Sequence, residues 1–265
     1  MPPALLQALN EEQARFGPFA GRVRWFEEIT STNDVALAAA EAGEDEGLVV
    51  LANRQTQGRG RLGRTWASVA GAGVYMSLLL RPSTAVMPLL TLTAGVAVAD
   101  GIEAATGLSV ALKWPNDACV RYGAGWKKLA GLLAEAGDTA TRRPYTVIGI
   151  GINVTGAACP PDIQHRATSI ETELQCPVDR GAVIVESLAA MAMRYAQVQR
   201  SEAERTQVLE AWRQRAAATL GRQVEWDDDG APVSGLAEGI DRTGALLIRT
   251  ASGHRRVTAG EVRWT

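Results

Sequence analysis

One stretch of the sequence, GRGRLGRT at residues 58–65, discriminates between several nucleotide-binding folds. Its three glycines fit the GxGxxG spacing of a dinucleotide-binding turn, and the whole stretch nearly fits a P-loop with arginine in place of lysine. Both motifs need a helix directly after the glycines, and the first also needs an acidic residue about 20 positions further on. Here Trp66, a glycine pair and another apolar run follow, and no Asp or Glu occurs between Gly63 and Asp100. We therefore exclude a Rossmann domain and a P-loop domain.

The same stretch carries three arginines within six residues, Arg59, Arg61 and Arg64. Because like charges repel, we expect this loop to be poorly ordered until an anion neutralises it. The planar guanidinium group suits carboxylate and phosphate oxygens. The loop therefore predicts an anion-binding site, and a solvated basic turn is the alternative.

On both sides of this loop, the hydrophobic pattern predicts strands interspersed with helices. The predicted strands are residues 22–27, 47–53, 73–80, 109–114, 129–135 and 145–154, and the predicted helices are residues 31–42, 88–106, 179–199 and 202–219. This order predicts an α+β domain around a mixed sheet. After Gly221 the pattern changes to short alternating runs separated by Asp- and Gly-rich turns, which predicts a small C-terminal β-barrel.

A second motif, KWPND at residues 113–117, lies at the end of a predicted strand. It presents a cation, an aromatic face, an amide and a carboxylate together, and such a set can bind a nucleotide. A turn stabilised by the Asn and Asp side chains explains the same residues equally well.

Two further strands contain glycines in apolar runs: KKLAGLLAE at residues 127–135 and VIGIGINV at residues 147–154. Glycine inside a strand often marks the close approach of a ligand or another backbone. Gly149 and Gly151 fall on one face of their strand, which leaves room beside it. Plain sheet packing and a lysine on an edge strand are the alternatives.

Composition limits the class of protein further. A chain of 265 residues with 46% hydrophobic content forms a large core, and a net charge of −2 indicates no nucleic-acid partner. The N-terminus lacks the pattern of a signal peptide, so we expect a cytoplasmic protein. Gly, Pro, Asp or Arg is expected to interrupt each apolar stretch before the roughly 18 residues of a membrane helix, so we expect no membrane span. Three widely spaced cysteines and two histidines indicate neither a disulfide framework nor a zinc site.

The four motifs, preceded by Ser31-Thr32-Asn33, resemble the biotin protein ligase family in order and approximate spacing, from about residue 22 to the end. The resemblance is to the short form that lacks the N-terminal DNA-binding domain. It implies a mixed-sheet catalytic domain of the class II synthetase-like biotin/lipoate ligase type, followed by an SH3-like β-barrel. The implied boundaries are an N-terminal extension at 1–21, a catalytic biotin- and ATP-binding domain at 22–218 and the barrel at 219–265.

The resemblance also assigns roles to individual residues. Lys128 and Arg61 would be catalytic, although Lys127 is an immediate neighbour of Lys128. The implied biotin-binding residues are Ser31, Thr32, Asn33, Gln55, Gly58, Arg59, Arg61, Lys128, Gly131 and Gly149. The implied nucleotide-binding residues are Arg61, Arg64, Trp66, Lys113, Asn116, Asp117 and Asn153.

The implied reaction joins biotin and ATP into biotinyl-AMP and then transfers biotin to a lysine of a biotin carboxyl carrier protein. Two anions must meet in the first step, so positioned positive charge is the main requirement, and no enzyme nucleophile is needed. Mg²⁺ is expected with ATP, near Asp117, without a dedicated protein site. A homodimer is an expectation from the family. The alternatives are a lipoate or octanoate ligase and a non-catalytic biotin-sensing regulator.

Overall fold

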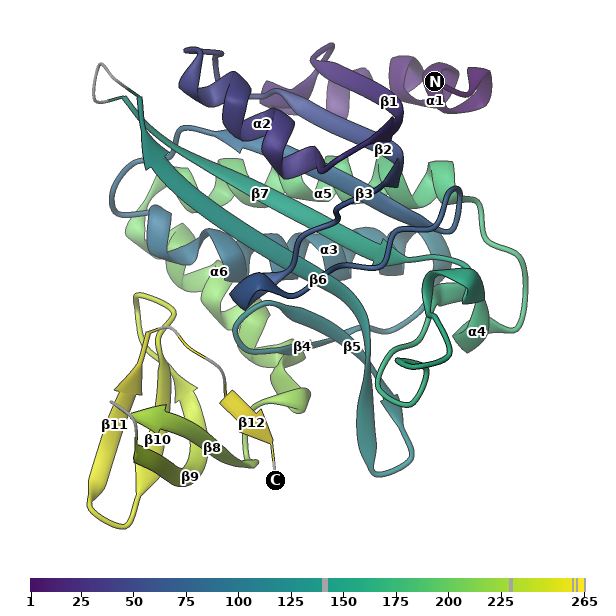
Figure 1. The fold of residues 1–265 in the computed structure, drawn as a ribbon. Helices are drawn as coiled ribbons and strands as arrows, with labels where there is room; N and C mark the ends of the chain where they lie inside the picture. Colours follow the sequence, from purple (N-terminus) through teal and green to yellow (C-terminus); the bar gives the residue numbers. More distant parts are fainter. Residues whose placement is uncertain (140–142, 229–230, 259, 261, 265) are drawn as a thin grey trace.

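A seven-stranded mixed sheet forms the centre of the molecule, and a five-stranded sheet lies beside it (Figure 1). This computed structural model describes residues 1–139, 143–228, 231–258, 260 and 262–264. The strand order is β1-β2-β3-β7-β6-β5-β4 in the large sheet and β11-β10-β9-β8-β12 in the small one. β1 runs parallel to β2, whereas the other neighbouring strands pair antiparallel. The α+β class with a mixed sheet, predicted from the sequence, is confirmed.

The elements begin and end as follows. The large sheet consists of β1 (Val23–Ile29), β2 (Val49–Gln55), β3 (Gly73–Leu80), β4 (Ala111–Lys113), β5 (Asp117–Tyr122), β6 (Gly125–Asp138) and β7 (Pro144–Asn153). The helices are α1 (Pro3–Glu11), α2 (Thr32–Glu41), α3 (Leu90–Thr106), α4 (Ile170–Leu174), α5 (Arg180–Arg200) and α6 (Glu202–Arg215). The small sheet consists of β8 (Gln223–Asp228), β9 (Ala231–Ile240), β10 (Leu246–Thr250), β11 (Gly253–Val257) and β12 (Val262–Trp264).

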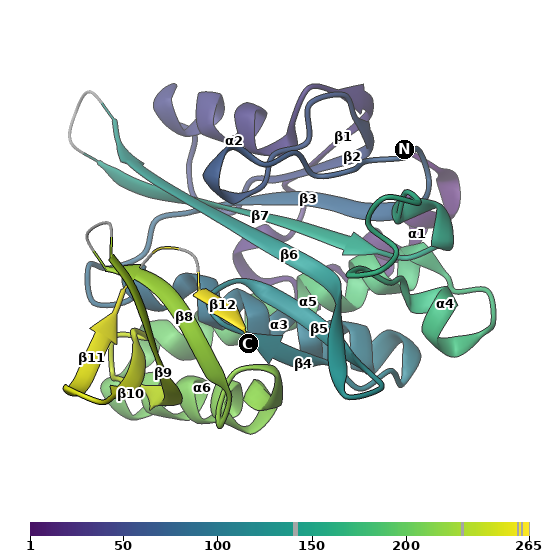
Figure 2. The same cartoon turned by 60° about the horizontal axis from the view of Figure 1, so that its bottom comes forward.

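Both faces of the large sheet are covered, and β3 shows why. Every residue of β3 is buried, so the strand is apolar without alternation. Met76 and Leu78 belong to a large core cluster that includes the buried sides of α3 and α5. Leu79 belongs to a smaller cluster beneath α2. Figure 2 shows α2 on one side of the sheet and α3, α5 and α6 on the other. The site described below lies on the α2 side.

The apolar helix α3 corrects one expectation from the sequence. Residues Met87–Thr106 are long and apolar enough to cross a membrane by length and composition, so the apolar stretch is not broken as we expected. Two thirds of its apolar window, 67%, is buried inside the molecule, where α3 packs between the sheet and α5. A central core helix meets the same length and composition criteria as a membrane helix, and burial in this core accounts for the apolar composition of α3.

The N-terminal segment packs against the core around the large sheet. Leu5 and Leu9 of α1 are buried, and Phe16 and Phe19 are 1% and 0% exposed within the large core cluster. Arg15 donates to Glu186 of α5 at 2.8 Å. Residues 1–21 therefore contribute apolar side chains to the core, and the domain boundaries expected from the sequence stay predictions.

The small C-terminal sheet is attached to the large sheet through the KWPND motif. The indole N–H of Trp114 donates to the carbonyl of Gly244 at 3.0 Å, and the backbone N–H of Trp114 donates to Thr219 Oγ1 at 2.8 Å. Trp114 is only 3% exposed, and the peptide bond between it and Pro115 is cis. This buried tryptophan thus connects the end of β4 with the turn between β9 and β10, and β12 lies beside β4 and β5 (Figure 2).

Candidate active site

Two adjoining cavities lie between the sheet and the glycine-rich loop. The larger has a volume of about 380 Å³ and the smaller about 50 Å³. Five residues line both cavities: Gly60, Arg61, Trp66, Asn116 and Lys128. The cavities are therefore neighbours, and these residues form the wall between them.

The smaller cavity is bounded by β2, β6, β7 and the start of α2. Nine of the ten residues that the sequence assigned to biotin line it: Ser31, Thr32, Asn33, Gln55, Arg59, Arg61, Lys128, Gly131 and Gly149. Gly58 lies outside the lining. A Cβ atom at Gly58 would lie 2.5 Å from the Trp66 carbonyl oxygen, so a glycine is needed where the two ends of the glycine-rich loop approach each other closely.

Buried polar side chains fix the geometry of this smaller cavity. Gln55 Oε1 accepts from the Thr32 backbone at 2.8 Å and from the Thr32 hydroxyl at 3.0 Å. Ser77 on β3 is 0% exposed. Its hydroxyl lies 2.7 Å from Thr32 Oγ1 and 2.6 Å from Asn33 Oδ1, and it can donate its proton to either oxygen. Because these groups are bonded to one another, their side chains are held in one arrangement before any ligand enters.

Glycines on β6 and β7 form the floor beneath these side chains. A Cβ atom at Gly149 would lie 2.2 Å from Asn33 Oδ1, and one at Gly151 would lie 2.4 Å from the Trp66 ring. A Cβ atom at Gly131 would meet both Lys128 and Trp66 at 2.8 Å. The missing side chains thus make room for the side chains of Asn33, Trp66 and Lys128, whereas the sequence predicted the close approach of a ligand or another backbone, and the approach of a ligand stays a prediction.

The glycine-rich loop folds back on itself above this floor. Trp66 donates its backbone N–H to the Gly58 carbonyl at 2.8 Å, and Gly60 donates to the Arg64 carbonyl at 2.7 Å. At the tip, Leu62 has a left-handed backbone with φ 56° and a side chain that is 65% exposed. Arg61 and Arg64 of this loop line the larger cavity and Arg59 lines the smaller one, while the Leu62 side chain faces solvent.

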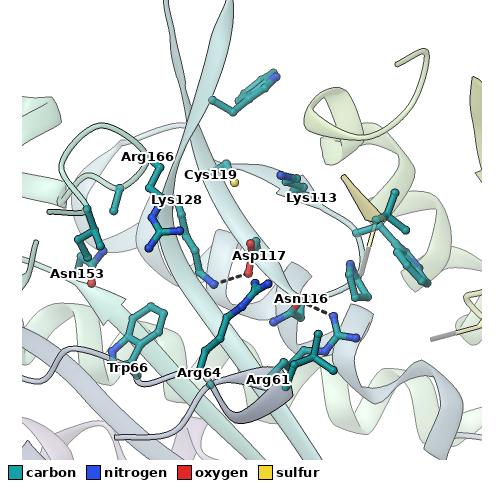
Figure 3. Close-up of a pocket in the computed structure, with 18 of the residues that line it drawn as sticks. Arg61, Arg64, Trp66, Lys113, Asn116, Asp117, Cys119, Lys128, Asn153 and Arg166 are labelled. Atoms are coloured by element: carbon teal, nitrogen blue, oxygen red, sulfur yellow. Dashed lines mark hydrogen bonds and ion pairs between the residues drawn. The ribbon is translucent and has the colours of Figure 1, made fainter. Parts of the chain in front are cut away.

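Lys128 lies where the two cavities meet (Figure 3). Its Nζ atom is 2.6 Å from Asp117 Oδ1 and 5.3 Å from the centre of the Trp66 ring. Its backbone N–H donates to the Arg166 carbonyl, and its carbonyl accepts from Thr168, both at 2.9 Å. Lys127, by contrast, places its Nζ 3.9 Å from the Tyr122 ring and lines neither cavity.

The larger cavity gathers cations from distant parts of the chain. All seven residues that the sequence assigned to the nucleotide line it: Arg61, Arg64, Trp66, Lys113, Asn116, Asp117 and Asn153. Arg61 donates to Asn116 Oδ1 at 3.0 Å and to the Gly260 carbonyl at 3.0 Å, so it connects the loop with both domains. Asn153 donates to the Thr168 carbonyl at 3.0 Å.

Among the residues of this larger cavity that sequence reasoning missed are one cation and two tryptophans: Arg166, Trp126 and Trp264. Arg166 lies in the connection after β7, and Figure 3 shows it beside Lys128. Trp264 lies in β12, with Lys113 Nζ 5.1 Å from its ring centre. None of the three belongs to a motif, and only the fold brings them to the site.

The electrostatic environment favours anion binding rather than nucleophilic catalysis. Among the described residues that line the larger cavity, Asp117 is the one carboxylate, against five cations: Arg61, Arg64, Lys113, Lys128 and Arg166. Burial lowers the pKa of Lys113, as expected for an ammonium group removed from water. Burial also raises the pKa of the Cys119 thiol to about 12, so this cysteine is protonated at neutral pH and is no nucleophile.

Within the described parts of the chain, no three His, Cys, Asp or Glu side chains gather in a way that could hold a metal ion. Asp117 is the carboxylate that could meet a metal ion carried by the phosphates of a nucleotide, and it shares this position with Lys128.

Comparison with known proteins agrees with this geometry. Residues 25–153 match the biotin/lipoate A/B protein ligase family, and residues 219–263 match the biotin protein ligase C terminal domain. The biotin--[acetyl-CoA-carboxylase] ligase of Mycobacterium tuberculosis is 35% identical over 240 residues, which cover 88% of this chain and 85% of that relative. The bifunctional ligase/repressor BirA of Bacillus spizizenii is 34% identical over 262 residues, which cover 96% of this chain and 78% of the relative.

Among solved structures, the biotin protein ligase from Aquifex aeolicus in complex with biotin and ATP is similar to this fold, with a TM-score of 0.76 and 28% sequence identity. The similarity covers 92% of this chain and 99% of that one. Sequence relatives, domain order and fold thus agree over nearly the whole length, and the chain belongs to the biotin protein ligase family.

Proposed function

We propose that this protein joins biotin to ATP, forming biotinyl-AMP and pyrophosphate, and then transfers the biotinyl group to a lysine of a biotin carrier domain. The observation that carries this proposal is the position of Lys128 on the wall between the two cavities. A reaction that joins a carboxylate to a phosphate needs a cation at the point where both substrates meet.

The smaller cavity suits the ring system of biotin. At the end formed by α2 and β2 it presents neutral donors and acceptors on Thr32 and Gln55, which Ser77 helps to hold, and glycines form its floor. A compact, uncharged ureido ring needs such a set, whereas the flexible chain of lipoate or octanoate has no polar atoms to pair with it. The carboxylate at the other end of biotin would then point to Lys128 and Arg61.

The larger cavity suits ATP. In the first half-reaction an oxygen of the biotin carboxylate attacks the α-phosphorus, a P–O bond forms, and pyrophosphate leaves. Lys128, Arg61 and Arg64, which line this cavity, would offset the charge that builds on the phosphoryl oxygens. The indole N–H of Trp66 is buried without a hydrogen-bond partner in the described part of the chain, so it can donate to the adenylate.

In the second half-reaction the amine of the carrier lysine attacks the carbonyl carbon of biotinyl-AMP, an amide forms, and AMP leaves. The loop over both cavities would protect the mixed anhydride from water until the carrier docks. A biotin carboxyl carrier protein as acceptor, a homodimer, a cytoplasmic location and the lack of nucleic-acid binding all stay predictions. Cross-linking tests the carrier as acceptor, and light scattering tests the homodimer. Cell fractionation tests the location, and gel shifts test the binding of nucleic acid.

The decisive experiment incubates the purified protein with biotin, ATP and Mg²⁺, follows biotinyl-AMP by mass spectrometry, and then adds a carrier domain. We expect the adenylate first and a biotinylated lysine afterwards. Adenylate formation from lipoate or octanoate instead of biotin would reassign the substrate. Biotin binding without adenylate would leave a biotin-sensing regulator.

A further inference from the structure

An acidic side chain outside both cavities connects the floor of the smaller cavity to the glycine-rich loop. Glu135 lies on β6, four residues after Gly131 and therefore on the same face of the strand. One carboxylate oxygen, Oε2, accepts from Asn33 Nδ2 at 2.8 Å. The other, Oε1, pairs with the guanidinium group of Arg59 in the loop. Each oxygen thus bonds to a different element.

The bonds continue on both sides of Glu135. Asn33 Oδ1 accepts from Ser77, whose hydroxyl also reaches Thr32, and Thr32 is bonded to Gln55. On the other side, Arg59 also pairs with Asp34. Gln55, Thr32, Asn33 and Arg59 all line the smaller cavity, whereas Glu135 and Ser77 lie behind it. The network therefore surrounds the cavity without blocking it.

The charge and partial burial of Arg59 explain why a carboxylate is needed at Glu135. Partial burial opposes the charge on Arg59, yet its bonds to Asp34 and Glu135 keep the pKa of Arg59 above its usual value. The side chain of Glu135 is 24% exposed and that of Arg59 is 39% exposed, so water screens their attraction only in part. Without the carboxylate, Arg59 would be repelled by the other arginines of the loop, and Asn33 would lose an acceptor.

We propose that Glu135 is a positioning residue for biotin: it orients Asn33 in the pocket and holds the Arg59 end of the loop over it. This inference rests on the proposed function and extends it to a residue that touches neither substrate. If it is right, Glu135 controls the affinity for biotin and the retention of the adenylate, and ATP affinity in the larger cavity changes little.

The test compares Glu135→Gln with Glu28→Gln, a matched loss of one carboxylate from an ion pair, Glu28–Arg54, on the exposed edge of the same sheet. The glutamine keeps an acceptor for Asn33 but cannot pair with Arg59. Calorimetry measures the Kd for biotin, and steady-state kinetics measure the KM values for biotin and ATP. We expect Glu135→Gln to weaken biotin binding about fivefold, with an unchanged KM for ATP and an unchanged melting temperature.

Arg59→Gln and the double variant identify the mechanism. If the two residues act as a pair, the double variant binds biotin no more weakly than either single variant. Asp34→Asn, which removes a partner of Arg59 that makes no contact with Asn33, should have a smaller effect.

Additive effects, equal losses for biotin and ATP, or a Glu135→Gln variant that behaves like Glu28→Gln would each overturn the inference while the wild type still forms biotinyl-AMP. A wild type that binds no biotin would instead refute the proposed function.

Discussion

The two cavities share a wall but are built differently. The smaller is formed by adjacent strands and one helix, and its polar groups are bonded to one another through Thr32, Ser77 and Asn33. The larger is assembled from the loop, the end of β4, the connection after β7 and β12 of the C-terminal sheet. We infer that the first selects its ligand through a preformed shape, whereas the second depends on segments that must come together.

Replacing Lys128, which lines both cavities, should have the largest effect on activity, because it impairs the function of both cavities at once. Lys128→Ala is expected to slow adenylate formation about 100-fold to 1,000-fold, because it removes a charge that matters most as the phosphoryl group transfers. Exchange of labelled pyrophosphate into ATP measures the rate, and the melting temperature should stay close to that of the wild type. Lys127→Ala is the control, since its side chain contacts Tyr122. Normal exchange in Lys128→Ala would show that the shared wall is not the reaction centre.

The floor of the smaller cavity offers the next largest effect. Gly149→Ala places a methyl group 2.2 Å from Asn33 Oδ1, so we expect biotin affinity to fall roughly tenfold to 100-fold while ATP affinity is retained. Gly239→Ala is the matched control, because a Cβ atom there meets nothing within 4 Å. Unchanged biotin affinity in Gly149→Ala would mean that biotin does not bind in the smaller cavity.

A substitution in the C-terminal sheet should weaken the binding of ATP and leave the binding of biotin unchanged. Trp264→Ala removes an aromatic wall of the larger cavity and the ring near Lys113, so the KM for ATP should rise about threefold to tenfold. The Kd for biotin, measured without ATP, should stay the same. Trp264→Phe keeps an aromatic face and should recover most of the affinity. A larger effect on biotin than on ATP would contradict the division between the cavities.

The smallest effect on activity is expected at Asp241, which lines neither cavity. Asp241 accepts from the Thr243 backbone and hydroxyl at 2.7 Å and from Arg256 at 2.5 Å. Although its partial burial raises the pKa, these bonds prevail and lower it to about 2. A lowered pKa means stability that is present at neutral pH and lost as the pH falls from near 4 towards about 2.

Asp241→Asn should therefore reduce the free energy of unfolding by about 1–2 kcal/mol at pH 7 and change little in catalysis. Chemical denaturation at pH 7 and near pH 2 measures the free energy of unfolding of the variant and of the wild type at each pH. We expect the difference between the variant and the wild type to shrink at the lower pH. A pH-independent difference would mean that the charge of Asp241 is not the source of its contribution.

Much of the site was predictable because its motifs are local. The glycines of β6 and β7, the KWPND turn and the arginine loop each identified a segment, and the fold brings the segments together. Simple alternation along β6, however, places Lys127 rather than Lys128 on the face of Gly131. The pairing of β5 with β6 contains a register shift between Ala118 and Cys119, and this irregularity turns Lys128 toward Gly131.

Other residues could not be predicted because their positions depend on tertiary structure. Arg166 and Trp264 reach the larger cavity only through a β-bridge beside Lys128 and the attachment of the C-terminal sheet at Trp114. Phe16 and Phe19 were assigned to an extension, yet they are buried in the core. Periodicity identifies elements, whereas long-range packing decides which of them meet.

The hydrogen bond from Arg61 to the Gly260 carbonyl joins residues 199 positions apart, so it forms only after the C-terminal segment has been synthesised. The strands and helix around the smaller cavity are complete once β7 has emerged from the ribosome. Helices α5 and α6, which cover the other face of the sheet, and the residues Gly260 and Trp264 of the larger cavity are synthesised only afterwards, so we expect the complete site to form only when nearly the whole chain is available.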